Sequence, residues 1–370
     1  MTVPRGAFEL QRPNTADASP LRAWSAADQL VLDHLDTDDL GRVLIVNDEF
    51  GALAVGLHDA ERVVWSDSAL SRDAIRLNLV ENNIARVAAF VRGHEVPTGR
   101  FDTVVVRVPK TSALLEYQLQ MIAPCCDADT RVVGAAMARH VHSSTTQCFE
   151  ASFGPTTTSR ATRKARLIHA EHTGRGPLPE TESRSFVTDS GVMIAEMPGT
   201  FSAGRVDIGS ALLLRVLAAS DAPAVGAVVA DLGCGNGVLA ATLATHWPDA
   251  NFVLLDVSDL AIAAARQTFA RNGLSEQGTF LAADGFGEIA AESIDMVVTN
   301  PPFHQGHALD ADMTDRLLAD ASRALKRDGV LYLVAQRHLQ LHTRLKRWFN
   351  SVEVASKHPS HVVLVGSHPR

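Results

Sequence analysis

Short apolar runs that suit buried strands alternate with longer amphipathic runs that suit helices, and this alternation occurs twice along the chain. In the first half the strand-like runs cover residues 42–46, 62–65, 103–108 and 131–134, and the helix-like runs cover 25–35, 68–80, 112–122 and 145–153. In the second half the strand-like runs cover 227–230, 251–255, 296–298 and 330–334, and the helix-like runs begin at 238 and cover 258–269 and 312–325. Strands that take turns with helices are typical of βαβ units around a parallel sheet. The pattern predicts an α/β protein with two tandem Rossmann-like domains.

The segment 171–185, EHTGRGPLPETESRS, separates the two halves. It is polar and contains two glycines and two prolines, which favour a connection without regular structure. We therefore predict domains at 1–170 and 186–370, joined by a linker at 171–185.

The two halves also match one another in the order and spacing of a few residues, as a duplication would produce. The matches join Gly51 to Gly237, Asp67 to Asp256 and Asp102 to Asp295. Any two doubly wound domains share the alternation of strands and helices and part of its spacing, so similarity without duplication is the alternative. Duplication is the prediction that we carry forward.

Composition narrows the class of protein. The apolar fraction of 46% and the charged fraction of 21% are those of a globular chain with a sizeable core. A formal net charge of -8 argues against a polyanionic partner for the chain as a whole, although local basic clusters can still bind one. The beginning of the chain lacks the apolar stretch of an export signal, so a cytoplasmic location is expected. No metal site or disulfide framework is expected from the four cysteines, Cys125, Cys126, Cys148 and Cys234.

The segment 231–237, DLGCGNG, lies between a strand-like and a helix-like run, which is the context of a nucleotide-binding glycine loop. Glycines let the backbone turn tightly and approach a ligand without a Cβ in the way. Nineteen residues after Gly237, Asp256 closes the next strand-like run. An acid at that place can bind both hydroxyls of a ribose. An ordinary strand-to-helix turn is the alternative for the loop taken alone.

Asn300-Pro-Pro-Phe303 follows another strand-like run, at the strand end where open α/β sheets bind their ligands. The prolines remove two N–H donors and leave carbonyl groups free to face a pocket. If Asn300 Oδ1 and the Pro301 carbonyl accept the two hydrogens of a planar amine, its lone pair turns toward an electrophile. Phe303 can stack on a flat substrate. Positioning and hydrogen bonding then supply much of the catalysis without a strong base. The alternative is a proline-stiffened loop.

Together, the two motifs resemble those of class I S-adenosylmethionine-dependent methyltransferases that act on planar amino nitrogens. Further segments resemble the bacterial ribosomal RNA guanine-N2 methyltransferases, a family with two tandem methyltransferase-like domains, over nearly the whole chain. The first half looks closer to the large-subunit (23S) enzyme than to its small-subunit (16S) relative. The segments that carry this resemblance are 21–28, 44–53, 108–116, 154–158, 164–167, 201–209 and 300–308.

The resemblance implies transfer of a methyl group from S-adenosyl-L-methionine to N2 of a guanine in 23S ribosomal RNA. It places Asn300, Pro301, Pro302 and Phe303 at the catalytic centre, with Asn300 also close to the cofactor. Asp231 would lie near the cofactor's amino group, Asp256 at the ribose and Asp284 at the adenine amino group, for which a surface turn is the alternative. The methionine part would lie over Gly233, Cys234, Gly235, Asn236 and Gly237.

The first half keeps the rhythm of the fold but loses these motifs. Asn47-Asp-Glu-Phe50 stands where the second half has 233–236, and Arg107 stands where it has Asn300. We therefore predict a degenerate domain that neither binds the cofactor nor catalyses. Its basic residues suit RNA phosphates or domain docking, with a solvated basic face as the alternative. The RNA-contact candidates of the whole chain are Arg107, Lys110, Arg160, Arg163, Lys164, Phe201, Arg205 and Arg337. A further basic cluster lies between 323 and 347.

Other functions stay open at this point. The same reaction on a 16S guanine, on adenine N6 or on a protein glutamine would use similar motifs. A non-catalytic RNA-binding assembly factor would keep the fold alone, and the intact glycine loop argues against it. The partner expected in most of these cases is ribosomal RNA, without a membrane.

Overall fold

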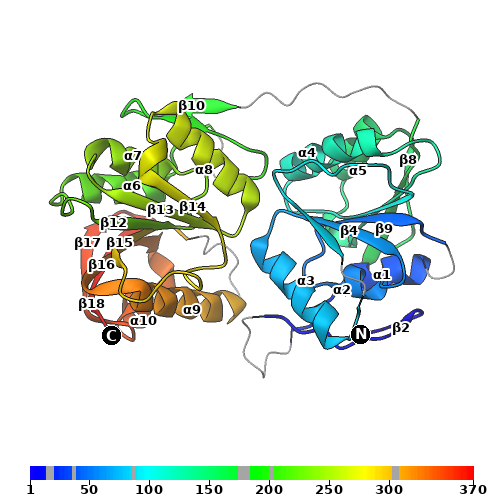
Figure 1. The fold of residues 1–370 in the computed structure, drawn as a ribbon, viewed down its shortest axis with the longest axis horizontal. Helices are drawn as coiled ribbons and strands as arrows, with labels where there is room; N and C mark the ends of the chain where they lie inside the picture. The colour runs from blue at the N-terminus through cyan, green and yellow to red at the C-terminus, as the bar shows by residue number, and fades with distance from the viewer. Residues whose placement is uncertain (14–20, 36–38, 86–87, 174–183, 201–203, 302–307) are drawn as a thin grey trace. The chain divides into compact units, whose positions relative to one another are not determined.

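A computed structural model describes residues 1–13, 21–35, 39–85, 88–173, 184–200, 204–301 and 308–370 (Figure 1). The chain forms two compact units, Met1–Glu182 and Ser183–Arg370. The boundary between them lies inside the predicted linker. Each unit is a helix-covered sheet with its own core, so each is described by itself.

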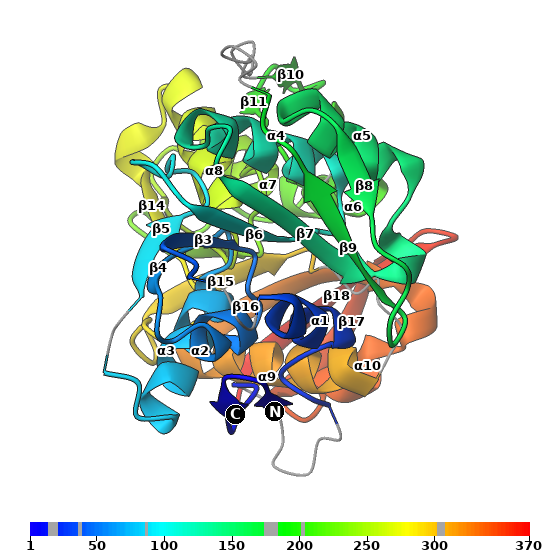
Figure 2. The ribbon, with the colours of Figure 1, turned by 90° about the vertical axis from the view of Figure 1, so that its right-hand side faces the viewer.

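The first unit is built on a seven-stranded sheet in the order β5-β4-β3-β6-β7-β9-β8 (Figure 2). The strands β3 to β7 are parallel, and β9 runs antiparallel to both β7 and β8. Helices α1, α2 and α3 pack on one face of the sheet and form a hydrophobic core with it, and α4 and α5 cover the other face (Figure 1). The strands are β3 (Arg42–Val46), β4 (Glu61–Ser66), β5 (Ala89–Arg92), β6 (Thr103–Arg107), β7 (Arg131–Met137), β8 (Thr156–Thr158) and β9 (Ala165–Ala170). The helices are α1 (Ala26–His34), α2 (Ala52–Gly56), α3 (Ala69–Glu81), α4 (Ser112–Ile122) and α5 (Ser143–Ser152), with 3₁₀ turns at Ala123–Cys125 and Ala138–His140. A small hairpin joins β1 (Thr2–Val3) to β2 (Gly6–Ala7).

The second unit repeats this plan in a sheet with the order β14-β13-β12-β15-β16-β18-β17. Helices α6, α7 and α8 pack on one face, and α9 and α10 pack on the other (Figure 1). The strands are β12 (Val228–Leu232), β13 (Asn251–Asp256), β14 (Gly278–Ala282), β15 (Ile294–Thr299), β16 (Leu325–Gln336), β17 (Phe349–Lys357) and β18 (His361–Pro369). The helices are α6 (Ile208–Ala218), α7 (Val238–His246), α8 (Asp259–Arg271), α9 (Ala308–Ala324) and α10 (Leu341–Leu345), with 3₁₀ turns at Ser275–Gln277 and Arg337–Leu339. A separate hairpin joins β10 (Ser185–Val187) to β11 (Met193–Ala195).

The chemistry of the sequence explains these elements. In central strands such as β3, RVLIV, every residue after the first is apolar and buried, because helices cover both faces of a parallel sheet. Polar side chains mark where helices begin: Ser68 accepts a hydrogen bond from the Ser71 N–H at the start of α3, and Ser258 accepts one from the Ala261 N–H at the start of α8. The carboxyl ends of the parallel strands therefore meet helix starts at one edge of each sheet.

The identical strand order of the two sheets supports the predicted duplication. The match of Asp102 with Asp295 also holds. The Asp102 carboxylate accepts the backbone N–H of Arg42, the first residue of β3, and the Asp295 carboxylate accepts that of Val228, the first residue of β12. The predicted match of Asp67 with Asp256 is wrong by one residue. Val46 pairs with Trp65, and Leu232 pairs with Leu255, so the residue at the place of Asp256 is Ser66.

Candidate functional site

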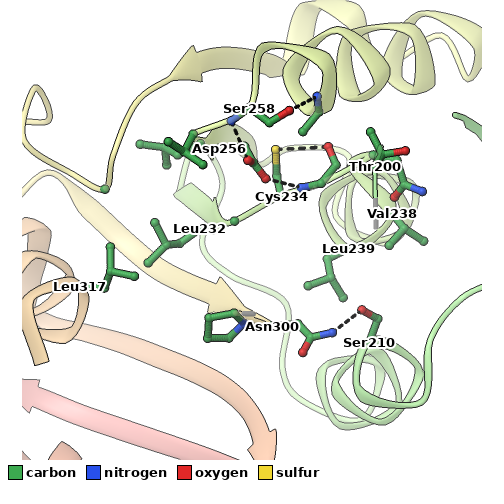
Figure 3. Close-up of a pocket in the computed structure, with 18 of the residues that line it drawn as sticks. Thr200, Ser210, Leu232, Cys234, Val238, Leu239, Asp256, Ser258, Asn300 and Leu317 are labelled. Carbon is green, nitrogen blue, oxygen red and sulfur yellow. Dashed lines mark hydrogen bonds between the residues drawn. The ribbon is translucent and has the colours of Figure 1, made fainter. Parts of the chain in front are cut away.

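A cavity of about 320 Å³ opens at the carboxyl ends of β12, β13 and β15 in the second unit (Figure 3). Its size lies within the range of small-molecule sites. The glycine loop after β12, Asp256 after β13 and Asn300 after β15 all line it, although they are far apart in the sequence. The start of α6 and part of α9 complete the wall. The fold thus brings the predicted cofactor loop and the predicted catalytic motif to one cavity.

Two kinds of glycine occur in the loop. Gly233 and Gly235 have φ values of 71° and 54°, and a Cβ at either would meet nothing within 4 Å. Gly237, with φ 78°, would place a Cβ 3.1 Å from the Cβ of Ala265 in α8. The first two glycines leave room for a ligand beside the backbone, whereas the third permits close packing of α7 against α8. This division of roles is that of a nucleotide-binding loop.

Asp256 lies on the cavity wall with its carboxylate held by the backbone (Figure 3). Oδ2 accepts the Gly235 N–H at 2.9 Å, and Oδ1 accepts the Ser258 N–H at 2.9 Å. Burial raises the pKa of this carboxyl above its ordinary value, while the hydrogen bonds oppose the rise. A carboxylate oxygen has a second lone pair, so Asp256 keeps acceptor capacity for a ribose hydroxyl.

Asp231 is not on the cavity wall. Its side chain is fully buried, and Oδ2 accepts the Ala240 N–H at 3.1 Å in the first turn of α7. Oδ1 has no hydrogen-bond partner among the described residues. Burial raises the pKa of this carboxyl to about 7. Its predicted proximity to the cofactor's amino group stays a prediction, and the orphaned oxygen is the atom that an added donor would satisfy.

Cys234 and Asn236 lie in the same loop and line the cavity. The Cys234 side chain is buried, and burial raises the pKa of its thiol well above the ordinary value. A neutral buried thiol is a poor nucleophile. Cys234 is therefore a small buried residue of the loop and not a nucleophile.

Asp284 lies on the wall near α9, and an arginine already holds it. Arg316 Nη2 donates to Oδ1 at 2.7 Å and to Oδ2 at 2.8 Å, and Nη1 donates to the Asp284 carbonyl at 3.2 Å. Sequence reasoning missed Arg316, since the two residues are 32 positions apart. The pair fixes the direction of the carboxylate, and a contact with adenine stays a prediction.

Asn300 follows β15 and faces the start of α6 (Figure 3). Its Nδ2 donates to Asp207 Oδ1 at 3.0 Å, to Asp207 Oδ2 at 3.2 Å and to Ser210 Oγ at 3.0 Å. Pro301 lines the cavity beside it. Asp207 and Ser210 also line the cavity, and the sequence analysis did not single them out as site residues. Pro302, Phe303 and Phe201 lie outside the described residues.

Side-chain contacts fill the corresponding place in the first unit. Asn47, with φ 61°, stands at the position of Gly233. It exchanges two hydrogen bonds with Gln118, at 2.7 and 2.8 Å, and donates to the Arg107 carbonyl at 3.0 Å. Asp48 is fully buried and accepts the backbone N–H groups of Leu53 and Ala54 in α2. Burial raises the pKa of this carboxyl to about 7, although the hydrogen bonds oppose the rise. Ser66 offers no carboxylate for a ribose.

Arg107, a predicted RNA contact, is held by partners inside the first unit. Its Nε pairs with Asp28 at 2.7 Å, Nη1 donates to the Ala135 carbonyl at 2.8 Å, and Nη2 donates to Ser25 Oγ at 3.2 Å. The arginine and aspartate side chains are only 17% and 10% exposed. All three guanidinium nitrogens therefore have partners inside the unit, which supports a structural role, and the RNA contact of Arg107 stays a prediction.

The other basic candidates are all exposed: Lys110, Arg160, Arg163, Lys164, Arg205 and Arg337. Arg205 also lines the cavity. Arg163 lies 3.5 Å from Asp33 in an ion pair. The cluster between 323 and 347 is largely committed to local contacts: Lys326 pairs with Asp295, and Arg344 and Arg347 both pair with Asp315. An RNA surface made by that whole cluster is thus not supported.

In the part of the chain that the structure describes, no helix is long and apolar enough to cross a membrane. The His, Cys, Asp and Glu residues of that part form no group of three or more that could hold a metal ion.

Two family models match the chain. Residues 1–174 match the RLMG N-terminal domain, and residues 191–365 match the methyltransferase small domain. Curated relatives match over nearly their whole length. A protein of Streptomyces griseus named ribosomal RNA large subunit methyltransferase G is 39% identical, with 98% of each chain covered. The protein of the same name from Pseudomonas syringae is 37% identical, with 96% of each chain covered.

A solved structure resembles the chain over nearly its whole length. The 16S rRNA N2 methyltransferase RsmC of T. thermophilus, in complex with AdoMet and guanosine, gives a TM-score of 0.79. The match covers 99% of this chain and 96% of that one at 22% sequence identity. At that identity the likeness speaks for the fold, which has the same tandem arrangement.

Proposed function

Because the chain belongs to the family of the ribosomal RNA large subunit methyltransferase G proteins, we propose that it methylates one guanine of 23S ribosomal RNA at the exocyclic N2. S-Adenosyl-L-methionine is the methyl donor, and S-adenosylhomocysteine and N2-methylguanine are the products. The cytoplasm is the proposed location, since bacteria make and modify ribosomal RNA there.

A single observation carries this proposal. The glycine loop, Asp256 and Asn300 line one cavity, which places a cofactor loop and an amine-binding amide within the reach of one ligand pair. Separate binding and reaction sites would not produce this convergence from three strand ends.

The cavity fits the cofactor in three respects. Gly233 and Gly235 leave open space beside the loop backbone, where the methionine part would lie. Asp256 keeps lone pairs for the ribose hydroxyls, and Asp284 offers a fixed carboxylate for the adenine amino group. The sulfonium of S-adenosylmethionine supplies an electrophilic methyl group when bound.

The chain's part in the reaction is to orient the amine. Asn300 Oδ1 and the Pro301 carbonyl accept the two N2 hydrogens, which turns the nitrogen lone pair toward the methyl group. These acceptors also stabilise the positive charge that develops on N2, and water takes the released proton. Phe303 stacks on the guanine, by the sequence argument alone. The protein needs no strong base, because the positively charged N2 that forms on methylation gives up its proton readily to water.

We further propose that the first unit binds no cofactor and contributes to RNA placement. The filled strand ends around Asn47 and the missing acid at Ser66 support the first statement. The exposed Arg160 and Lys164 support the second. In the second unit, the exposed Arg205 and Arg337 are proposed to contact RNA as well. Net charge does not oppose it, because phosphate contacts depend on local cations.

The test is methylation by the purified full chain with isotopically labelled cofactor. Deproteinised 23S RNA, 16S RNA and assembled large subunits serve as parallel substrates, and the nucleosides are separated after digestion. Label in N2-methylguanosine from 23S RNA is the expected result. Label in 16S RNA, in N6-methyladenosine or in protein glutamine would overturn it, and so would a chain that binds the cofactor but transfers nothing.

A further inference from the structure

Asn300 is held by a carboxylate whose own position is fixed. Asp207 is the N-cap of α6, and its Oδ1 accepts the backbone N–H of Gly209 at 2.9 Å and of Ser210 at 3.2 Å. The same carboxylate accepts a hydrogen bond from Nδ2 of Asn300, and so does Oγ of Ser210 in the first turn of α6. Helix capping therefore locks the group that holds the asparagine.

The chemistry of this contact sets the orientation of the amide. An ionised carboxylate accepts hydrogen bonds and donates none. Asn300 must therefore present its NH₂ group to Asp207, because the reverse orientation would bring two acceptor oxygens together. With the NH₂ group so committed, Oδ1 of Asn300 is the atom left to meet a ligand.

We propose that Asp207 and Ser210 are positioning residues that fix the amide polarity of Asn300, so that the site accepts an amino group and rejects a carbonyl. This rests on the proposed function, since guanine carries donors at N1 and N2 and an acceptor at O6. A reversed amide would offer N–H groups to the N2 amine, where two donors repel, and would favour O6 instead.

The first unit gives an independent view of the same device. Arg107 occupies the place of Asn300 and contacts Ser25 and Asp28, the N-cap and third residue of α1. The second unit has the acid at the N-cap and the hydroxyl three residues later, so the two groups are exchanged. In both units, therefore, one carboxylate and one hydroxyl at the start of a helix hold the side chain that follows the central strand, Arg107 at the end of β6 or Asn300 after β15.

Asp207→Asn separates polarity from capping. Asparagine caps a helix as well as aspartate does, so stability should hold. Its amide also offers a donor to Asn300, which removes the demand for one orientation. We expect kcat to fall by roughly tenfold or more with KM for the cofactor nearly unchanged. Asp207→Ser is a second variant that keeps the helix cap but lacks the second oxygen. Its kcat should fall by a similar factor.

A second change should restore the activity. In Asp207→Asn combined with Asn300→Asp, the new amide donates to one oxygen of residue 300, and the other oxygen faces the amine. Asn300→Asp alone brings two carboxylates within about 3 Å, which disfavours their joint ionisation. The double variant should therefore exceed both single variants in kcat. Turnover within twofold of the wild type in Asp207→Asn, or a double variant no better than Asp207→Asn, would overturn the proposal.

A spectroscopic measurement keeps this result separate from the proposed function. The Nδ2 protons of Asn300, observed with ¹⁵N-labelled protein without substrate, should be shifted and protected from exchange in the wild type. Both features should disappear in Asp207→Asn and weaken in Ser210→Ala. Unchanged signals would refute the positioning role. A wild type that shows these signals but methylates no guanine would refute the substrate assignment and leave the amide orientation standing.

Discussion

Gly237 packs so closely against Ala265 that a Cβ on the glycine would lie 3.1 Å from the alanine Cβ. The first unit repeats this contact: a Cβ on Gly51 would lie 3.2 Å from the Cα of Ile75 in α3. The ligand-facing glycines have no such repeat, since Asn47 replaces Gly233. Packing and ligand binding are thus carried by different glycines of one loop.

Gly237→Ala and Gly233→Ala should consequently have different effects. Both residues have positive φ, so alanine costs about 1 to 2 kcal/mol at either position. At Gly237 overpacking against α8 adds about 1 to 3 kcal/mol. Urea unfolding should therefore show the larger loss in Gly237→Ala. Calorimetric titration with S-adenosylmethionine should show the larger loss of affinity in Gly233→Ala. Equal unfolding free energies would contradict the packing role.

Asp256→Ala should weaken cofactor binding by about 1.5 to 3 kcal/mol, because charge-assisted hydrogen bonds to the ribose are lost. Asn300→Ala is the comparison: it should abolish methyl transfer and leave cofactor affinity largely intact. Equilibrium titration and a single-turnover assay on RNA measure the two effects. Asp249→Ala, an exposed carboxylate, controls for the change of charge. An unchanged dissociation constant in Asp256→Ala would exclude it from the ribose site.

The stability of the chain should depend on the buried acids Asp48 and Asp231, since burial raises the pKa of each to about 7. An acid with a raised folded pKa binds a proton on folding at pH values between its unfolded pKa, about 3.9, and the folded one. The contribution of each buried acid to the free energy of unfolding is therefore largest at low pH, where the acid is neutral, and falls as the pH rises toward 7. Urea unfolding at about pH 5 and about pH 8 should show this fall, and Asp231→Asn should show a smaller one. The same slope in both proteins would mean that Asp231 titrates normally.

Arg107→Ala should destabilise the first unit without weakening RNA binding. Removal of the guanidinium leaves Asp28 nearly buried and unpaired, at a cost of about 3 to 5 kcal/mol. Arg160→Ala, at an exposed position, should do the opposite: stability stays, and the slope of log affinity against log salt for RNA falls by about 0.9. Denaturant unfolding and filter binding at several salt concentrations compare the two. Weaker RNA binding by a folded Arg107→Ala protein would restore its predicted role in RNA contact.

Local sequence patterns predict much of this fold, because each central strand is an apolar run and each helix is an amphipathic run. The strand 42–46 and the helix 112–122 have the predicted bounds for this reason. The cavity was also predictable, since loops at the carboxyl ends of parallel strands must converge. The side chains that hold the site residues in place were not predictable. Asp207 and Asn300 are 93 positions apart, and no period or motif links an N-cap to a distant strand end. The match of Asp67 to Asp256 failed because spacing alone does not reveal register.

The exchange of ligand glycines for side-chain contacts has a consequence for how the two units respond to heat. A ligand that binds only the folded state raises the stability of the unit that holds it. Asn47, Gln118 and Arg107 supply the first unit with bonds of its own, and these are indifferent to the cofactor concentration. The second unit leaves that space for a metabolite. Cofactor binding should therefore stabilise the second unit directly, whereas the bonds around Asn47 stabilise the first unit whether or not the cofactor is bound.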